Sequence, residues 1–334
     1  MDAFSFTRAT TLDQAIQSAA QSPTAQQGAE VRFVAGGTTL IDLMKLTVER
    51  PKQVVDINGL ALDRIESTPD GGLIIGALTR NSDVARHPKV QRDYAVLSQA
   101  LLSGASPQLR NMATTGGNLL QRTRCVYFRD TAHACNKREP GTGCSAIGGH
   151  NRMLAILGTS KDCIATNPSD QNVALAALEA TIQIQGAKGK RNVPIAAFYL
   201  LPGSTPQREN VLEPGDVITS VTLPAPAAGT RSLYLKLRDR AAYEFALASA
   251  AIVIKVDNGK IHHARVALGG VGTKPWRSSE AEAVLQGHVA DEALFRKAAE
   301  AALKDAQPAS ENGFKVELSK RCLIRALTMS VKLA

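Results

Sequence analysis

The sequence predicts an α+β protein, and three features of the chain support this fold class. A strand, a glycine turn, a helix and a second strand follow one another over residues 31–57. Short strands and helices alternate through the middle, and residues 245–269 have the pattern of two strands joined by an AspAsnGly turn, with helices after them. With 334 residues, 44% of them hydrophobic, the chain can bury a sizeable core and divide into two or three domains.

The first segment predicts a short βαβ unit. Residues 31–35, ValArgPheValAla, are rich in β-forming side chains, and Gly36 and Gly37 then break the strand. A threonine after these glycines can cap a helix over about 40–46. A strand at 53–57, GlnValValAspIle, closes the unit.

The middle of the chain contains a second glycine turn, ThrThrGlyGlyAsn at 114–118, which leads directly into a cysteine-rich segment. The elements expected around it are a strand at 73–75, a helix over about 90–102, a helix from about 172, and strands near 181–185 and 216–223. The cysteine-rich segment itself has no helix or strand period, so we expect a long loop there.

The segment ProAlaProAlaAlaGly at 224–229 is the best linker candidate, because its composition favours neither helix nor strand. Beyond it, strands near 234–237, 245–256 and 262–269 predict a small antiparallel sheet. We therefore expect one domain over 1–225, with subdomains of about 1–57 and 58–225, and a second domain over 230–334.

Composition and charge exclude several classes of function. The net charge is +9, but aromatic content is only 4% and the basic residues are scattered singly, which argues against a nucleic-acid-binding protein. The longest apolar run, Phe245 to Ile254, is too short to span a membrane. The N-terminal residues do not have the pattern of an export signal, which favours the cytoplasm, although export as a passenger on a signal-bearing partner remains open.

The two double-glycine loops are candidate anion sites. Glycine lets the backbone approach a ligand closely, and a strand-to-helix turn points N–H groups and the helix dipole at a phosphate. Two such loops in one domain indicate a pyrophosphate, although ordinary turns have the same composition. Asp56 lies about twenty residues after Gly36, but the G-x-G-x-x-G spacing of dinucleotide-binding folds and the G-K-[ST] ending of ATP-binding loops are both missing.

Four of the five cysteines lie close together in the sequence, and Cys322 is far away. Their wide spacing argues against structural zinc, which commonly uses C-x2–4-C pairs, but it leaves zinc, disulfides and an iron–sulfur cluster all open. Five basic side chains in the same loop could offset the negative charge of a cluster: Arg122, Arg124, Arg129, Lys137 and Arg138.

Five motifs together carry a resemblance that covers nearly the whole chain. They are FVAGGTTLIDLMK (33–45), ATTGGNLLQ (113–121), AsnProSerAsp (167–170), LEPGDVITSVTLP (212–224) and KLRDRAAYEFALAS (236–249). The chain resembles the FAD-binding subunits of the xanthine dehydrogenase, or molybdenum hydroxylase, family. Within it, the cysteine-bearing insertion at about 121–165 resembles that of periplasmic aldehyde oxidoreductases of the PaoABC type. The resemblance implies a vanillyl-alcohol-oxidase (PCMH) type FAD-binding domain of two subdomains, followed by an α+β domain like the C-terminal domain of CO dehydrogenase flavoproteins.

The resemblance also implies two cofactors and their ligands. The FAD contacts would be Ala35, Gly36, Gly37, Thr38, Thr39, Leu40, Thr114, Thr115, Gly117, Asn118, Leu119, Ser169, Asp170, Ile218 or its neighbour Val217, and Lys236. A [4Fe–4S] cluster would be held by Cys125, Cys135, Cys144 and Cys163. Many relatives have HisProSerAsp where this chain has Asn167, so a role for that imidazole does not carry over.

The function implied is an oxidoreductase subunit that transfers electrons and carries no catalytic residue of its own. A large molybdenum subunit would oxidise an aldehyde, a small [2Fe–2S] subunit would relay the electrons, and FAD in this chain would pass them to an external acceptor. The heterotrimer would be periplasmic through its partner's signal, or else cytoplasmic, with neither nucleic acid bound nor a membrane-inserted segment. The alternatives are the flavin subunit of another molybdenum hydroxylase, of the xanthine dehydrogenase or hydroxybenzoyl-CoA reductase type, a stand-alone flavin oxidase, and a flavin-free zinc-binding scaffold.

Overall fold

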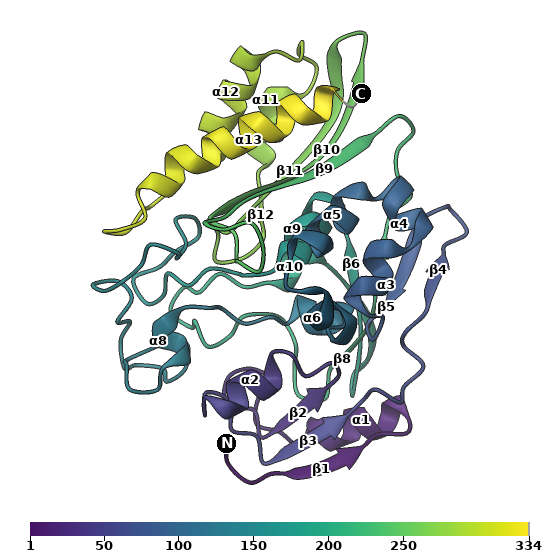
Figure 1. The fold of residues 1–334 in the computed structure, drawn as a ribbon. Helices are drawn as coiled ribbons and strands as arrows, with labels where there is room; N and C mark the ends of the chain where they lie inside the picture. Colours follow the sequence, from purple (N-terminus) through teal and green to yellow (C-terminus); the bar gives the residue numbers. More distant parts are fainter. Residues whose placement is uncertain (333–334) are drawn as a thin grey trace.

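The computed structural model describes residues 1–332 and arranges them around three β-sheets (Figure 1). The N-terminal part holds a parallel sheet of order β1-β3-β2 with two helices. Its elements are β1 (Ser5–Arg8), α1 (Leu12–Ala20), β2 (Val31–Val34), α2 (Leu40–Lys45) and β3 (Gln53–Asp56). The predicted βαβ unit is confirmed, because β2, α2 and β3 follow one another and the two strands are parallel neighbours.

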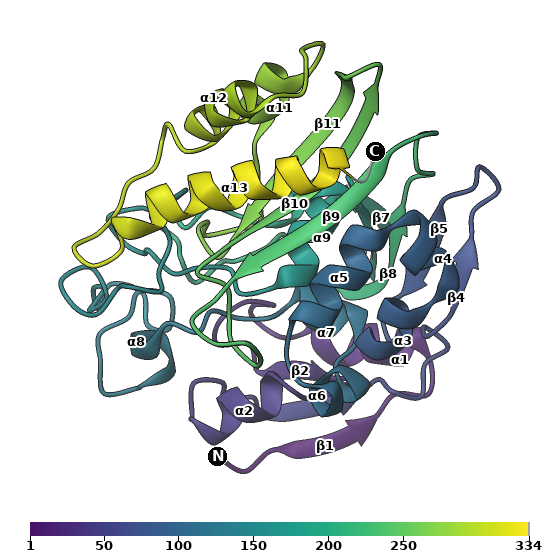
Figure 2. The ribbon, with the colours of Figure 1, turned by 45° about the horizontal axis from the view of Figure 1, so that its top comes forward.

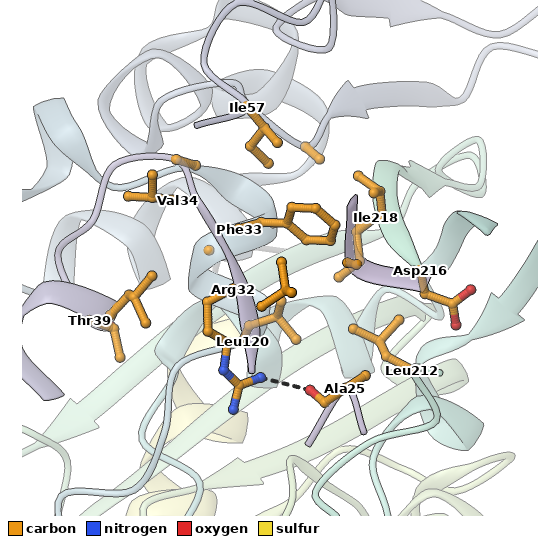
Figure 3. A pocket seen from close by; sticks show the side chains of 18 of the residues that line it. Ala25, Arg32, Phe33, Val34, Thr39, Ile57, Leu120, Leu212, Asp216 and Ile218 are labelled. Atoms are coloured by element: carbon orange, nitrogen blue, oxygen red, sulfur yellow. Dashed lines mark hydrogen bonds between the residues drawn. The ribbon is translucent and has the colours of Figure 1, made fainter. Parts of the chain in front are cut away.

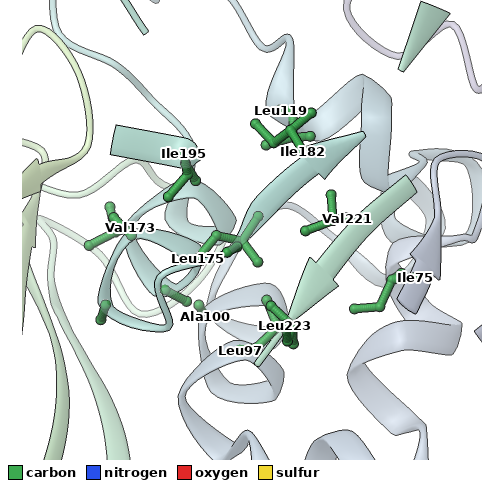
Figure 4. Packing of buried hydrophobic residues seen from close by; sticks show 14 of the residues in the cluster. Ile75, Leu97, Ala100, Leu119, Val173, Leu175, Ile182, Ile195, Val221 and Leu223 are labelled. Carbon is green, nitrogen blue, oxygen red and sulfur yellow. The ribbon is translucent and has the colours of Figure 1, made fainter. Parts of the chain in front are cut away.

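The middle part contains an antiparallel sheet of order β4-β5-β8-β6-β7 covered by helices. Its strands are β4 (Ile65–Ser67), β5 (Leu73–Gly76), β6 (Thr181–Gly186), β7 (Gly189–Pro194) and β8 (Val217–Leu223). Its helices are α3 (Asn81–Arg86), α4 (Pro88–Asp93), α5 (Ala95–Ser103), α6 (Pro107–Met112), α7 (Thr115–Leu119), α9 (Asp170–Ala177) and α10 (Ile195–Phe198). Side chains of β5, β6 and β8 pack against α5 and α9 in the largest apolar cluster (Figure 4).

The segment between α7 and α9 is the long loop that the sequence predicts. Its only helix is α8 (Val126–Arg129), which has four residues, and its backbone otherwise forms turns and isolated bridges. The views in Figures 1 and 2 agree that α8 and the rest of this loop lie at one side of the molecule, close to α2.

The C-terminal part is an antiparallel sheet of order β12-β11-β10-β9 with three helices on one face (Figure 2). Its elements are β9 (Arg231–Leu237), β10 (Ala248–Asp257), β11 (Lys260–Gly269), β12 (Trp276–Arg277), α11 (Ser279–Leu285), α12 (Glu292–Ala302) and α13 (Phe314–Lys332). Alternate side chains of β10 explain how it joins the rest. Ile252 and Ile254 pack toward the C-terminal helices, whereas Ala251 belongs to the core of the middle part.

One expected helix differs from the structure. Residues 90–102 form parts of two helices, α4 and α5, which meet at Tyr94 with φ −133° and ψ 45°. The Tyr94 hydroxyl donates a hydrogen bond of 2.9 Å to the carbonyl of Pro224, so the break points this side chain at the exposed segment before β9. A tertiary contact therefore overrides a continuous helical pattern.

Candidate functional site

A cavity of about 220 Å³ lies between the N-terminal and middle parts; we call it the main cavity. It is lined by the first glycine loop, by Thr114, Gly116 and Gly117 of the second, and by residues 212–218. Figure 3 shows Phe33, Ile57, Leu212 and Ile218 around one region of it and Thr39 at another. The cavity is thus apolar along one stretch and bordered by glycines and hydroxyl groups along another.

The first glycine loop offers unused hydrogen-bond donors to the main cavity. Within residues 1–332, the backbone N–H groups of Gly36 to Thr39 donate to no protein acceptor, and the Thr39 side chain does not cap α2. Gly37 has φ +71°, the left-handed region that glycine adopts without strain. Free N–H groups and hydroxyls beside a cavity are the donors that a phosphate needs, so the predicted cradle at Ala35 to Leu40 remains a candidate pyrophosphate site.

The second glycine loop differs from the first, because its backbone donors are already used. The N–H groups of Thr115 and Gly116 donate to the carbonyls of Thr79 and Ala77, and that of Gly117 donates to the Thr114 hydroxyl. This loop therefore contributes surface and the Thr114 hydroxyl, whereas the sequence pattern alone indicated a second set of free amides. The other expected contacts, Thr115, Asn118 and Leu119, are buried and do not line the main cavity.

The two glycine loops lie close together because Gly36 has no side chain. A Cβ atom on Gly36 would lie 1.9 Å from the carbonyl oxygen of Met112, at the end of α6. This contact joins the N-terminal part to the middle part directly beside the main cavity. Gly36 is thus required by packing between the loops as well as by access of a ligand.

A second cavity, of about 170 Å³, has Ser169 and Asp170 in its wall. Asp170 accepts from the Lys236 ammonium at 2.8 Å and from the Tyr234 hydroxyl at 2.6 Å, and the Lys236 side chain is only 3% exposed. Asp170 thereby offsets the charge of Lys236 in a buried site. Ile218 and Lys236 were both expected to contact FAD, but Ile218 lines the main cavity, whereas Lys236 contacts Asp170 in the wall of the second.

The four clustered cysteines meet at one small cavity in the long loop, although up to 38 positions separate them in the sequence. Cys125, Cys135 and Cys163 are buried, Cys144 is half-buried, and all four are reduced. Burial raises the pKa of Cys125 to about 11 and also raises the pKa of Cys163. A bound cation would reverse this preference, because it deprotonates a coordinating thiol.

The cysteines are nevertheless not packed tightly. No group of three or more His, Cys, Asp or Glu side chains in residues 1–332 could hold a metal ion. A single tetrahedral zinc would bring its sulfur ligands to about 3.8 Å from one another, from a Zn–S distance of about 2.3 Å. The four cysteines line one cavity. The donor set of four thiols fits an iron–sulfur cluster, whose ligands attach to different iron atoms.

The basic side chains of the loop are arranged around these cysteines in ion pairs. Arg124 and Arg129 contact Asp42 of α2, and Arg122 and Lys137 share Glu209. Arg138 has no carboxylate partner within residues 1–332; it donates instead to the carbonyls of Tyr127, Phe128 and His133. One guanidinium nitrogen of each of these four arginines, within the same described range, has no acceptor. Of these five basic side chains, Lys137 lines the cysteine cavity itself.

Two known protein families match the chain, and their matches together cover nearly all of it. Residues 2–226 match the family described as the FAD binding domain in molybdopterin dehydrogenase, and residues 233–330 match the CO dehydrogenase flavoprotein C-terminal domain. The chain belongs to the FAD-binding subunits of the molybdenum hydroxylase family. This FAD-binding subunit is therefore an oxidoreductase subunit, and its predicted α+β fold class is confirmed.

Individual relatives agree with the family. The chain is 51% identical over 330 residues, 98% of each chain, to the aldehyde oxidoreductase FAD-binding subunit PaoB of Escherichia coli K12. It is 28% identical over 287 residues to the carbon monoxide dehydrogenase medium chain of Hydrogenophaga pseudoflava, covering 86% of this chain and 83% of that one. A solved carbon monoxide dehydrogenase from that organism, lacking the Mo-pyranopterin moiety, superposes with a TM-score of 0.77 at 26% identity over 99% of this chain and 98% of its own.

Sequence reasoning missed several residues of the main cavity. Arg32, Glu49 and Arg122 line it, as do residues 212–216 on the opposite side. Arg32 and Arg122 both bind Glu49, across 17 and 73 positions of sequence, so no local motif reveals the group.

Within residues 1–332, no helix is long and apolar enough to cross a membrane.

Proposed function

We propose that this FAD-binding subunit also carries a [4Fe–4S] cluster and transfers electrons within a heterotrimeric, molybdenum-dependent aldehyde oxidoreductase. Electrons would reach it from the molybdenum and [2Fe–2S] subunits and leave through FAD to an external acceptor. The proposed location is the periplasm, reached with a signal-bearing partner. The proposed domains are 1–225, with the cysteine insertion at about 121–165, and 230–334.

The observation that carries the proposal is the convergence of four distant cysteines on one cavity. Chance positions of buried thiols would scatter them, as the fifth cysteine shows: Cys322 lies on α13 in the C-terminal core. The four-thiol set, with the Lys137 ammonium at the same cavity and unused guanidinium donors in the same loop, favours a multi-iron group. Identity of 51% to PaoB, named as an aldehyde oxidoreductase subunit, supports the aldehyde as the substrate of the complex.

For FAD, this chain's residues would bind, orient and shield the cofactor. The free amides of Gly36 to Thr39 would hold the pyrophosphate, and the apolar wall that includes Phe33, Ile57 and Ile218 would exclude water. Asp170, fixed by Lys236, would present its carboxylate at the second cavity. Of the remaining expected contacts, Thr114 and Gly117 line the main cavity and Ser169 lines the second, whereas Thr115, Asn118 and Leu119 are buried and would act through the residues that they support.

The test is the composition of the purified full chain. One FAD, about four irons and about four inorganic sulfides per chain support the proposal. Replacement of Cys135 by Ser is expected to remove the iron and the electron paramagnetic resonance signal of the reduced cluster, while some FAD stays bound. Replacement of Cys322 by Ser is the matched control, and it should leave the iron content unchanged.

Other results of these measurements would support the alternative functions. A protein with zinc and no iron would exclude the cluster, and turnover of an aldehyde by the isolated chain would indicate a stand-alone flavin oxidase. Activity of the native complex on xanthine or a hydroxybenzoyl thioester, with none on aldehydes, would assign it to another branch of the family.

A further inference from the structure

The short helix α2 belongs to the flavin site and to the cysteine site at the same time. It begins directly after the first glycine loop, and Leu40 and Leu43 line the main cavity. Leu43 is 1% exposed and packs in one apolar cluster with Cys125, Cys135 and Cys163. A shift of α2 would therefore change both the main cavity and the cysteine cavity.

Charges fasten the cysteine loop to α2 on both sides of Cys125. The Asp42 carboxylate accepts from Arg124 at 3.3 Å and from Arg129 at 2.8 Å, one residue before and four residues after that cysteine. Arg124 also lies over the ring of Phe245, 5.1 Å from its centre, at the second cavity. Asp42 thus sets the position of the chain that carries the first thiol.

A second connection is a largely buried chain of alternating charges. It runs from Arg32 to Glu49, Arg122, Glu209 and Lys137, with N–O distances of 2.5 to 3.0 Å between successive members. Its first three members line the main cavity, and Lys137 lines the cysteine cavity. Glu49 is 3% exposed, so its carboxylate depends on both arginines for compensation. Loss of order at either end removes one of the two cationic partners of Glu49 or of Glu209.

We propose that Asp42 and Glu49 are positioning residues that couple the two sites, so that FAD and the [4Fe–4S] cluster each favour binding of the other. FAD held by the first glycine loop would fix α2, which carries Asp42 and whose Leu43 carbonyl accepts from the N–H of Glu49 at 3.2 Å. These carboxylates hold Arg124, Arg129 and Arg122 where the cysteines converge. Because binding linkage is reciprocal, an assembled cluster raises the affinity for FAD by the same factor. The inference rests on the proposed function, since it requires the cluster.

The experiment is a double-mutant cycle on the full chain, with FAD dissociation constant and iron content as readouts. In the parent, Cys135→Ser should weaken FAD binding by about tenfold, within the usual range of coupling between sites. In the Asp42→Asn background, which keeps the size of a half-exposed side chain, the same cysteine change should weaken FAD by less than about threefold. Asp42→Asn alone should also lower iron content when FAD is withheld during expression.

The control is Glu30→Gln, which removes an exposed ion pair with Lys52 on the same sheet and should change neither readout. Circular dichroism establishes whether each variant is folded. If Asp42→Asn does not fold, Glu49→Gln tests the second carboxylate in its place. A parent chain with no iron overturns the cluster and the coupling with it. A parent with about four irons, whose FAD affinity is the same with and without Cys135, overturns the coupling alone and leaves the proposed function intact.

Discussion

Lys315 permits the sharpest prediction about stability, because its ammonium is wholly buried at the junction of the cysteine loop and the C-terminal helix. It is 0% exposed, and its Nζ donates to the carbonyls of Met153 at 3.2 Å, Leu154 at 3.0 Å and Gly270 at 2.5 Å. Burial, with a smaller contribution from Arg152, lowers the pKa of Lys315 from 10.5 to about 7. The folded protein therefore releases this proton more readily than the unfolded chain does.

The direction of the pH effect follows from proton linkage. Between about pH 7 and 10.5 the unfolded chain binds more protons at this lysine, so the free energy of unfolding rises with pH in that window. Below pH 7 both states are protonated and the cost of burying the charge is constant. Integration from pH 7 to 9 gives a gain of about 2 kcal/mol.

The perturbation is Lys315→Met, which removes the titrating group and leaves three carbonyls without a donor. Unfolding in urea at pH 7 and pH 9 can be followed by fluorescence of Trp276, the single tryptophan of the chain, which lies on β12 in the C-terminal part. The parent should gain about 2 kcal/mol between the two pH values and the variant should gain none from this source. An equal gain in both proteins would refute the buried, easily deprotonated ammonium.

Three further predictions concern the two cofactor sites. Gly36→Ala places a methyl group 1.9 Å from a backbone carbonyl of the middle part, so it should weaken FAD binding by at least about tenfold in a flavin titration; unchanged affinity would show that the loops separate freely. Asp170→Asn leaves the Lys236 charge unpaired and should lower the free energy of unfolding by about 3 kcal/mol, whereas the double variant with Lys236→Met should recover at least half. Arg122 and Lys137 hold the pKa of Glu209 at about 2 against the opposing effect of burial. This stabilisation is present above about pH 4.5 and lost toward pH 2, so at pH 7 Glu209→Gln should cost about 1 to 2 kcal/mol, reduced because a quarter of the side chain is exposed. Urea titration at pH 7 and pH 3 should show that cost shrinking in acid, and an equal cost at both would contradict it.

The sequence predicts the elements whose pattern is local. The hairpin of β10 and β11 turns at Asn258 and Gly259, both with positive φ, as the AspAsnGly motif requires. The β2-α2-β3 unit and the first glycine loop were likewise identified from neighbouring residues. These features depend on periodicity and backbone conformation, which short stretches of sequence encode.

The features that escaped prediction depend on distant partners. Neither the break at Tyr94 nor the binding of Glu49 by Arg122 has a local signal, because their partners lie 130 and 73 positions away in sequence. The used amides of the second glycine loop are a similar case: ThrThrGlyGlyAsn looks equivalent to the first loop until Ala77 and Thr79 take its donors. Composition can identify a loop able to bind an anion, but only the packing around it decides which donors stay free.

The cysteine loop shows the same principle at a larger scale, because side chains from all three parts of the molecule hold it in place. Asp42 and Glu49 bind it from the N-terminal part, and Glu209 binds it from the middle part. From the C-terminal part, Asn312 donates to the carbonyls of Leu154 and Ala155, and Lys315 donates to that of Leu154. A segment with almost no secondary structure has little local stability, and its non-local contacts form only after the elements that supply them. We therefore expect the four thiols to converge late in folding, and any metal group they bind would stabilise the assembled molecule as a whole.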